Sequence, residues 1–526
     1  MRITHAASIA VACTALTVST AYASSTWGGA VQASTTGQHA ARASVAVSPD
    51  GSRTLLSWQE DIAADTVIRS AYSDDHGATW SSPHTISSSV LSWASSKVMF
   101  SGDGTHASAV YRSDSAGNSI AKWVGSSDAG KTWAQPVTVS NGAQNAGNVH
   151  GTTSIDGSRQ TVIWQGAAAG GDQIQVASTN DGGQTWTAQR TISAANTDNN
   201  TQYYLPIAAS SDGKHVFALW DATEGLLQRI FVSVSADGGL TWSNPSRVSA
   251  ILEKAEDASI ATSADGKTVI ATWDRISGAN TVVQVSRSTD FGVTWSVPMD
   301  VSSTGDGNTQ PVIAMNAEGT TAAVLWTGTG AGNTDVIKSA ASADGGVTWS
   351  SPTAISTLGA VAPSIASSTG SFIAATWMAQ AGGGESAAGA TSTDGGLTWS
   401  AETVFEPNSG PATEQRVAAS ANGHWAAVTW TNRDNLVFAT VFSHLETPSA
   451  PRDVVVNPEA TTASVTFTPP VDDGGSSVTN MEYSLDAGGT WTALNPASAA
   501  PPFSIKDLDQ GTSYRFQLRS VNAQGA

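Results

Sequence analysis

The stretch Ser73-Asp74-Asp75-His76-Gly77-Ala78-Thr79-Trp80 decides the fold, because its pattern Ser/Thr-x-Asp-x-Gly-x-Thr-Trp recurs along most of the chain. Within such a stretch, aspartate accepts hydrogen bonds from nearby backbone N–H groups, and glycine allows a positive φ. Successive central aspartates are 50 to 56 residues apart, and a period of that size indicates a repeat architecture. The aspartates are Asp75, Asp128, Asp181, Asp237, Asp290, Asp344 and Asp394.

This repeated octapeptide resembles the Asp-box, or bacterial neuraminidase repeat, of sialidases and other β-propellers. In that family the Asp-box is a folding element on the rim away from the active site. The resemblance therefore implies that the seven aspartates are structural turn residues, without a catalytic or metal-binding role. We expect Thr-Trp to begin the strand that follows each turn.

A second set of landmarks precedes each Asp-box. A strand that usually ends in Trp follows a turn of the Ser-x-Asp-Gly type, so one unit contains four short antiparallel strands, a to d. Such a unit is a propeller blade. The aromatic landmarks are Trp58, Tyr111, Trp164, Trp220, Trp273, Trp326, Trp377 and Trp430. The sequence thus predicts an all-β chain with eight blades, and seven blades plus an irregular segment is the alternative.

The eighth unit lacks an Asp-box and has only three strands before Glu446. The segment from Thr26 to Ser34 matches the end of an Asp-box and its following strand, so we expect it to supply the missing strand and close the ring. In this scheme 15 of the 19 tryptophans have a packing role. The remaining four are Trp93, Trp123, Trp425 and Trp491.

The N-terminal residues are typical of a secretory signal peptide. A charged start precedes an apolar run, and Ala21-Tyr22-Ala23 is a small-x-small cleavage pattern, so residues 1–23 are expected to be removed. The only cysteine, Cys13, lies in this segment and fits a lipoprotein site poorly. We therefore predict a secreted, extracellular or cell-surface protein without disulfides or a membrane span.

The charge balance limits the partners. With 24 Lys and Arg residues against 43 Asp and Glu residues, the net charge of −19 argues against nucleic acid binding. No histidine cluster, phosphate loop or nucleophile elbow is present, so neither a cofactor nor a metal is implied. The expected partner is an extracellular glycan or a surface protein, bound by a monomer.

The last 80 residues follow a different pattern, and the propeller is expected to span residues 24–446. From residue 447 the sequence resembles a fibronectin type III domain, in which Leu508, Gly511 and Tyr514 match the tyrosine corner. The chain stops at Ala526, where the last strand of that fold is expected, so we favour a fragment of a longer protein over an incomplete module. Ser484 to Trp491 spells an Asp-box within this region, which we interpret as a convergent hairpin turn.

The propeller face opposite the Asp-boxes is the expected working face. Sialidases hold the substrate carboxylate with three arginines and use a tyrosine nucleophile beside an acidic residue, so the resemblance suggests an arginine cluster where units 8, 1 and 2 meet. The catalytic candidates are Arg42, Arg112, Arg416, Arg433 and Tyr204. Arg42 lacks the Ile-Pro that follows the first arginine in that family, and the connection from Thr85 to Lys97 contains no acid.

Two classes of function remain open. The first is a non-catalytic propeller that binds a glycan, a cell-wall component or a protein, with the fibronectin type III domain as spacer or adhesion module. The second is a sialidase-like glycoside hydrolase with a divergent site. An enzyme predicts carboxyl groups with strongly shifted pKa values in one deep pocket, whereas a binder predicts a shallow aromatic groove. The ligand-binding candidates are Trp93, Tyr203, Tyr204, Asp221, Asp274 and Arg275.

Overall fold

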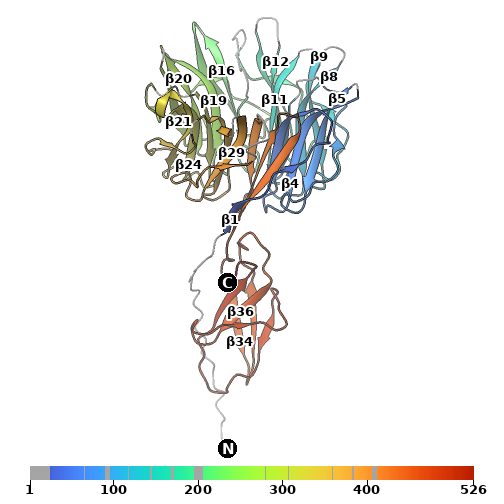
Figure 1. The fold of residues 1–526 in the computed structure, drawn as a ribbon, viewed down its shortest axis with the longest axis vertical. Coiled ribbons are helices and arrows are strands. Elements are labelled where there is room, and N and C mark those ends of the chain that lie inside the picture. Colours follow the sequence, from blue (N-terminus) through green and yellow to red (C-terminus); the bar gives the residue numbers. More distant parts are fainter. Residues whose placement is uncertain are drawn as a thin grey trace, which may run out of the picture. The chain divides into compact units, whose positions relative to one another are not determined.

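A computed structural model shows a ring of β-sheets and a separate β-sandwich (Figure 1). It describes residues 24–526 except 64, 89, 91–94, 116–117, 143–144, 168–170, 195–204, 279, 306, 308, 358, 382–383 and 406–411. The chain divides into two compact units, one formed by Trp27–Val441 and one that contains Phe442–Ala526. No helix of the described residues is long and apolar enough to cross a membrane.

The first four blades each contain four antiparallel strands, named a to d outward from the centre of the ring. Blade 1 consists of β3 (Ala40–Val47), β4 (Thr54–Ile62), β5 (Asp65–Ser73) and β6 (His84–Thr85). Blade 2 consists of β7 (Ser96–Phe100), β8 (Ala107–Ser115), β9 (Asn118–Ser126) and β10 (Val137–Thr138). Blade 3 consists of β11 (Ala146–Thr153), β12 (Gln160–Gly166), β13 (Gln173–Thr179) and β14 (Arg190–Thr191). Blade 4 consists of β15 (Ile207–Ala209), β16 (Val216–Glu224), β17 (Leu227–Ser235) and β18 (Ser246–Arg247).

The remaining blades continue the ring. Blade 5 consists of β19 (Lys254–Thr262), β20 (Val269–Ser277), β21 (Asn280–Ser288) and β22 (Met299–Asp300). Blade 6 consists of β23 (Thr309–Met315), β24 (Ala322–Thr329), β25 (Asp335–Ser342) and β26 (Thr353–Ala354), with the 3-10 turn η1 (Ala331–Asn333) before β25. Blade 7 consists of β27 (Val361–Ser367), β28 (Ile373–Ala381), β29 (Gly384–Ser392) and β30 (Thr403–Val404). Blade 8 consists of β31 (Thr413–Ala419), β32 (Trp425–Thr431) and β33 (Val437–Leu445), with β1 (Ser24–Trp27) and β2 (Val31–Gln32).

The prediction of an all-β, eight-bladed propeller is confirmed. The chain's own N-terminal strands complete blade 8, since β2 pairs with β33 through Val31 opposite Ala439. The Gly28 N–H also donates to the Val441 carbonyl at 2.8 Å. This pairing joins residues more than 400 positions apart and removes the free edge that β33 would otherwise present.

The core lies between neighbouring blades. Seven strand-b tryptophans and Tyr111 are almost completely buried, as predicted. Each packs with side chains of the adjacent blade, as Tyr111 does with Leu55 and Ile68 of blade 1. Since every blade covers one face of the next, the closed ring leaves no apolar sheet face without a partner.

Strand b is longer than the sequence suggested. The pattern placed its end at Trp, but β4 continues from Trp58 to Ile62 and β16 from Trp220 to Glu224. The strand-b residues Arg112, Asp221 and Asp274 had been assigned to the following loops, and the correction is that they lie in β8, β16 and β20. They are held by ladder hydrogen bonds, and their side chains are therefore positioned more rigidly than loop side chains would be.

The Asp-box forms the predicted turn, but Thr-Trp does not begin a strand. Strand d of blade 1 covers only His84–Thr85, after Trp80. The turn closes through side chains: the Asp75 carboxylate accepts from the Ser73 hydroxyl, from the Thr79 N–H and from the Thr79 hydroxyl. The Ser73 hydroxyl in turn accepts from the Gly77 N–H. Because the turn saturates its own backbone groups, Thr79 and Trp80 need no strand partner.

A belt of backbone hydrogen bonds joins the blades at their a–b turns. In seven of the eight junctions, an N–H of one turn donates to the matching carbonyl of a neighbouring turn at 2.6 to 3.1 Å. Pro49 occupies this position in blade 1 and has no N–H, so the series is interrupted between blades 1 and 2. The turns surround a central cavity of about 310 Å³ lined by residues at and next to the a–b turns, including Pro49, Ser211, Ala317 and Ala421.

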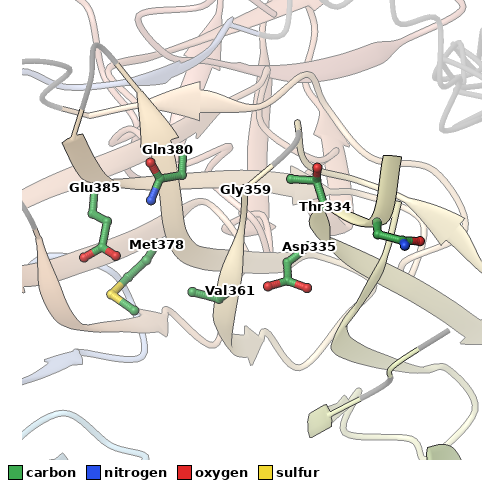
Figure 2. A pocket seen from close by; sticks show the side chains of 8 residues that line it. Thr334, Asp335, Gly359, Val361, Met378, Gln380 and Glu385 are labelled. Carbon is green, nitrogen blue, oxygen red and sulfur yellow. The ribbon is translucent and has the colours of Figure 1, made fainter. Parts of the chain in front are cut away.

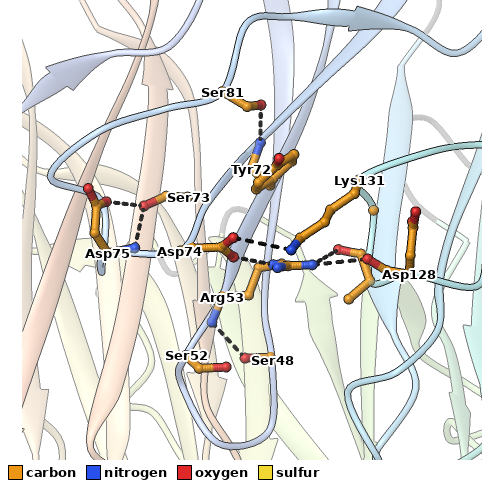
Figure 3. A network of polar contacts seen from close by, with 12 residues as sticks. Ser48, Ser52, Arg53, Tyr72, Ser73, Asp74, Asp75, Ser81, Asp128 and Lys131 are labelled. Atoms are coloured by element: carbon orange, nitrogen blue, oxygen red, sulfur yellow. Dashed lines mark hydrogen bonds and ion pairs between the residues drawn. The ribbon is translucent and has the colours of Figure 1, made fainter.

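Side chains join blades 1 and 2 where the backbone belt is interrupted (Figure 3). The Arg53 guanidinium donates to the carbonyls of Asp128 and Ala129 at 3.0 and 3.1 Å. It also forms an ion pair with Asp74, whose second oxygen lies 3.6 Å from the Lys131 ammonium. Arg53 thus connects the a–b turn of blade 1 to the Asp-box of blade 2.

The C-terminal unit contains two three-stranded sheets. One has the order β34 (Arg452–Pro458), β35 (Ala463–Thr468) and β38 (Phe503–Ile505), and the other β37 (Thr492–Ala493), β36 (Asn480–Ser484) and β39 (Gln517–Val521). The predicted tyrosine corner is present, because the Tyr514 hydroxyl accepts from the Asp509 N–H at 2.9 Å. Asp486 accepts the same set of turn hydrogen bonds as Asp75.

Candidate functional site at the channel mouth

A repeated irregularity shapes the end of the ring opposite the Asp-boxes. In six of the described inner strands, the register with strand b shifts around one non-glycine residue with φ between 49° and 58°. Such a β-bulge redirects a side chain, at a cost of about 1 to 3 kcal/mol for the strained backbone. We call the opening surrounded by these bulges the channel mouth. The bulge residues are Arg42, Asn148, Asp257, Gln310, Ala362 and Glu414.

The bulge residues belong to strands and not to the connections between blades. Arg42, Asp257 and Glu414, for example, lie in the inner strands β3, β19 and β31. Five of the six bulge residues stand nine positions before the glycine of the following a–b turn. This spacing is a signal that sequence reasoning missed. Tyr204 has the same spacing from Gly213, but it lies outside the described residues.

Cationic side chains gather on one side of the channel mouth. We call Arg42, Lys97, Arg112 and Arg416 the cationic arc, which comes from blades 1, 2 and 8. Burial lowers the pKa of Arg112, and the positive charge of Arg42 lowers it further. The pKa of Lys97 is likewise lowered, first by the protein around its ammonium group and then by Arg416. Arg42 thus lies close enough to Arg112, and Arg416 to Lys97, for the two positive charges of each pair to repel.

Two neighbours of the cationic arc modify its charge. Glu414 lies 3.6 Å from the Arg42 guanidinium, so the bulge residues of blades 8 and 1 form an ion pair. His150 of blade 3 has its pKa lowered to about 3 by burial and by the charges of Lys97 and Arg416. His150 is therefore neutral at physiological pH and adds no charge to the arc. Neither Lys97 nor His150 was singled out from the sequence, because only the folded ring brings them beside Arg416.

Acidic side chains gather across the mouth. We call Asp221, Glu256, Asp257 and Asp274 the acidic arc, which comes from blades 4 and 5. Burial raises the pKa of Asp221 to about 7, and the charges of Asp257 and Glu256 add to the effect. The side chain of Asp257 reaches solvent, yet its pKa is also raised by the surrounding protein and by Glu256. Glu256 itself is paired with Lys254 at 2.7 Å.

Asp274 is the most enclosed member of the acidic arc. It is 2% exposed, and one carboxyl oxygen accepts from the strained N–H of Gln310, the bulge residue of blade 6, at 3.0 Å. Its other oxygen, Oδ1, is buried and has no hydrogen-bond partner among the residues that the structure describes. Burial raises the pKa of Asp274 well above its usual range. A protonated Oδ1 would be a hydrogen-bond donor available to a ligand oxygen.

The other predicted site residues belong to neither the cationic arc nor the acidic arc. Arg275 is paired with Glu253 at 3.5 Å and with Asp300 at 3.0 Å, an arrangement that joins segments of blade 5. Arg433 is exposed in the turn between β32 and β33. Trp93, Tyr203 and Tyr204 lie outside the described residues.

The other three tryptophans outside the blade pattern either pack within the propeller or lie in the C-terminal unit. Trp123 is buried and donates to Gln160 at 2.7 Å, and Trp425 stacks on His76 at the junction of blades 8 and 1. Trp491, in the C-terminal unit, lies under the Arg519 guanidinium. Within the described parts of the chain, no three acidic, histidine or cysteine side chains are grouped to hold a metal ion.

Comparisons with known proteins identify both parts of the chain. Residues 54–273 match the BNR repeat-like domain, and residues 449–526 match the fibronectin type III domain. One similar structure is the intramolecular trans-sialidase from Ruminococcus gnavus, at 11% identity and a TM-score of 0.34, covering 76% of this chain and 94% of the other. An ulvan lyase of a new polysaccharide lyase family has 9% identity and a TM-score of 0.45, covering 78% and 95%. A protein of unknown function from Dyadobacter fermentans has 14% identity and a TM-score of 0.35, covering 60% and 98%.

Proposed function

The chain carries a BNR repeat-like domain and a fibronectin type III domain, and from this premise we propose that it is a secreted protein whose propeller binds an acidic glycan at the channel mouth. One observation carries the proposal: two pairs of like charges from blades 1, 2 and 8, Arg42 with Arg112 and Lys97 with Arg416, lie close together. A bound anion would relieve this repulsion. A carboxylate suits the site, because guanidinium groups bind planar oxyanions through paired hydrogen bonds.

The acidic arc complements this recognition. Sugar hydroxyls donate hydrogen bonds to carboxyl oxygens, and the unpartnered Oδ1 of Asp274 provides one such group beside Asp221 and Asp257. A glycan residue that carries both a carboxylate and hydroxyl groups can therefore contact the two arcs at once. The N-terminal signal pattern supports an extracellular place for this ligand.

A second candidate function is hydrolysis of the bound glycan. Its motivation is the raised pKa of Asp221, to about 7, together with that of Asp274. Glycosidases use one carboxylic acid that protonates the leaving oxygen and one carboxylate that acts as nucleophile or base. In this scheme Asp221 is the general acid, and an ionised neighbour in the acidic arc is its partner. The raised pKa values of Asp221 and Asp274 support this alternative, whereas the aromatic candidates for a binding groove, Trp93, Tyr203 and Tyr204, lie outside the described residues.

Binding and turnover can be measured with the same purified protein. A glycan array and calorimetry with sialosides and uronic-acid oligosaccharides test the first proposal, using the double variant Arg42→Ala/Arg112→Ala. Ala362 adopts the same bulge conformation as Arg42, so the fold should tolerate alanine there. We expect at least a tenfold loss of affinity, whereas the exposed control Arg433→Ala should bind normally. Unchanged affinity in the double variant would contradict the proposal.

Hydrolysis is tested with fluorogenic sialosides and other aryl glycosides. If the protein is an enzyme, Asp221→Asn should lose turnover but still bind the ligand, because the cationic arc remains intact. If the unmodified protein hydrolyses none of these substrates but still binds the glycan, the result would support the binding function alone.

A further inference from the structure

A second recess opens between blades 6 and 7 (Figure 2). Its volume of about 370 Å³ lies within the range of small-molecule sites. In Figure 2 the carboxylates of Asp335 and Glu385 lie on either side, with Met378 and Val361 between them. Asn333, Thr334, Gly359 and Gln380 complete the wall. No sequence motif indicates this recess, because its residues come from four separate segments.

The backbone of the recess is fixed by hydrogen bonds between those segments. The Asp335 carbonyl accepts from the N–H groups of Gly359 and Ala360 at 2.7 and 3.1 Å. The Gly359 carbonyl accepts from the Gln380 N–H at 3.2 Å. Gly359 has a φ of 84°, and a Cβ atom there would lie 2.5 Å from Cγ of Gln380. The glycine therefore allows the connection to approach blade 7 closely.

The side chains that line the recess have unused hydrogen-bonding capacity. Among the described residues, the carboxylates of Asp335 and Glu385 form no ion pair, and no lysine or arginine lines the recess. The side-chain amide of Gln380 likewise has no hydrogen-bond partner among those residues. Two negative charges without a counter-charge disfavour an acidic ligand and favour one that carries a positive charge.

We propose that the recess binds an amino sugar, that is, a sugar residue with a free, protonated amine. The ammonium group would pair with the carboxylate of Asp335 or of Glu385, and the hydroxyl groups would donate to the other carboxylate and to the amide oxygens of Gln380 and Asn333. The C–H face of the sugar ring would pack on Met378 and Val361. This ligand differs in charge from the acidic glycan of the channel mouth, so either proposal can fail without the other.

The test is calorimetry of the full chain with chitosan oligosaccharides, which carry free amines, and with N-acetylated chitin oligosaccharides of equal length. We expect binding of the amine-bearing ligand that weakens with added salt and drops at least tenfold in Glu385→Gln. The double variant Asp335→Asn/Glu385→Gln should lose it entirely. Asp434→Asn removes an exposed acid from a b–c turn of blade 8 and should leave the affinity unchanged.

Several results would overturn the proposal. Equal affinity for the N-acetylated ligand would show that the amine is not recognised. Loss of binding in Asp221→Asn but not in Glu385→Gln would place the amino sugar in the acidic arc of the channel mouth. Gly359→Ala provides a second variant, because its added methyl group would displace Gln380; normal binding there, with an unchanged melting temperature, would also contradict this site.

Discussion

The carboxylate of Asp237 accepts three hydrogen bonds inside its own turn, from the Ser235 hydroxyl and from the N–H and hydroxyl of Thr241. These donors lower the pKa of Asp237 despite partial burial, which acts in the opposite direction. The same contacts recur in every Asp-box of the propeller. At the scale of single residues, the Asp-box carboxylate thus caps its own turn, and we propose that this is its structural role.

Replacing Asp237 with alanine should lower the free energy of unfolding by about 1 kcal/mol, as loss of a capping-type hydrogen bond does. Chemical denaturation measures this change. Glycan binding should remain, because Asp237 lies at the end of the ring away from the channel mouth. A folded variant that no longer binds would show that the structural interpretation of the Asp-box is wrong.

The ionised Asp221 should destabilise the folded chain, whereas Asp237 stabilises it. A carboxyl group whose pKa is higher in the folded chain than in the unfolded chain weakens folding as the pH rises from about 4 to about 7. Asp221→Asn removes the charge and should raise the free energy of unfolding above pH 7, by on the order of 2 kcal/mol. The gain should disappear near pH 4. Thermal melting across this pH range checks it, and a gain that does not depend on pH would argue against a buried, ionising Asp221.

At the scale of elements, the junctions between blades are made in two ways. Most a–b turns are joined by backbone hydrogen bonds, whereas the junction of blades 1 and 2 relies on Arg53 and its partners because of Pro49. The inner strands carry bulges at the opposite end, where Arg42, Asp257 and Gln310 face the channel mouth. Regular hydrogen bonds between the a–b turns thus hold one end of the ring together, while the strained bulge residues lie at the other end.

Arg53→Ala should destabilise the propeller by about 1 to 3 kcal/mol, because it leaves two carbonyl groups without their donor and the partly exposed Asp74 with only the more distant Lys131. Urea denaturation of the full chain measures the loss. Arg190→Ala is the matched control, since Arg190 is exposed and donates one long hydrogen bond of 3.3 Å, and it should change stability by less than about 0.5 kcal/mol. Equal effects of the two substitutions would contradict a special role for Arg53.

At the scale of the whole molecule, ring closure depends on residues near the N-terminus of the chain. Trp27 packs against Phe405 with ring centroids 4.7 Å apart, and β2 pairs with β33. Without this segment, blade 8 would end at an exposed strand beside Trp430 and Phe438. The ring, and with it the channel mouth and both proposed sites, therefore depends on this one closing segment.

Deleting residues 24–36 should lower the melting temperature by on the order of 5 °C or more, because it opens the ring and exposes apolar surface. Differential scanning calorimetry measures this shift. A synthetic peptide of residues 24–36 added to the truncated protein should recover part of the loss. An unchanged melting temperature would contradict closure by the N-terminal segment.

The sequence by itself determined the blade architecture, because the Asp-box and Asp-Gly turns are local structures whose side-chain chemistry and spacing repeat. It also determined the closing segment, since residues 26–34 keep the blade pattern. It misjudged where strands end: Trp58 and Trp220 are not strand termini, because backbone pairing continues beyond the aromatic landmark. Local patterns indicate where a turn lies but not how far two strands remain paired.

Only the tertiary structure decided which side chains meet at the two sites. Arg42 and Glu414 form a pair because the ring brings its first and last blades together. Lys97 and His150 lie close to Arg416 for the same reason. The raised pKa values of Asp221 and Asp274 likewise depend on burial by other blades. The recess of Asp335 and Glu385 arises from the packing of blade 6 against blade 7, which no local motif encodes.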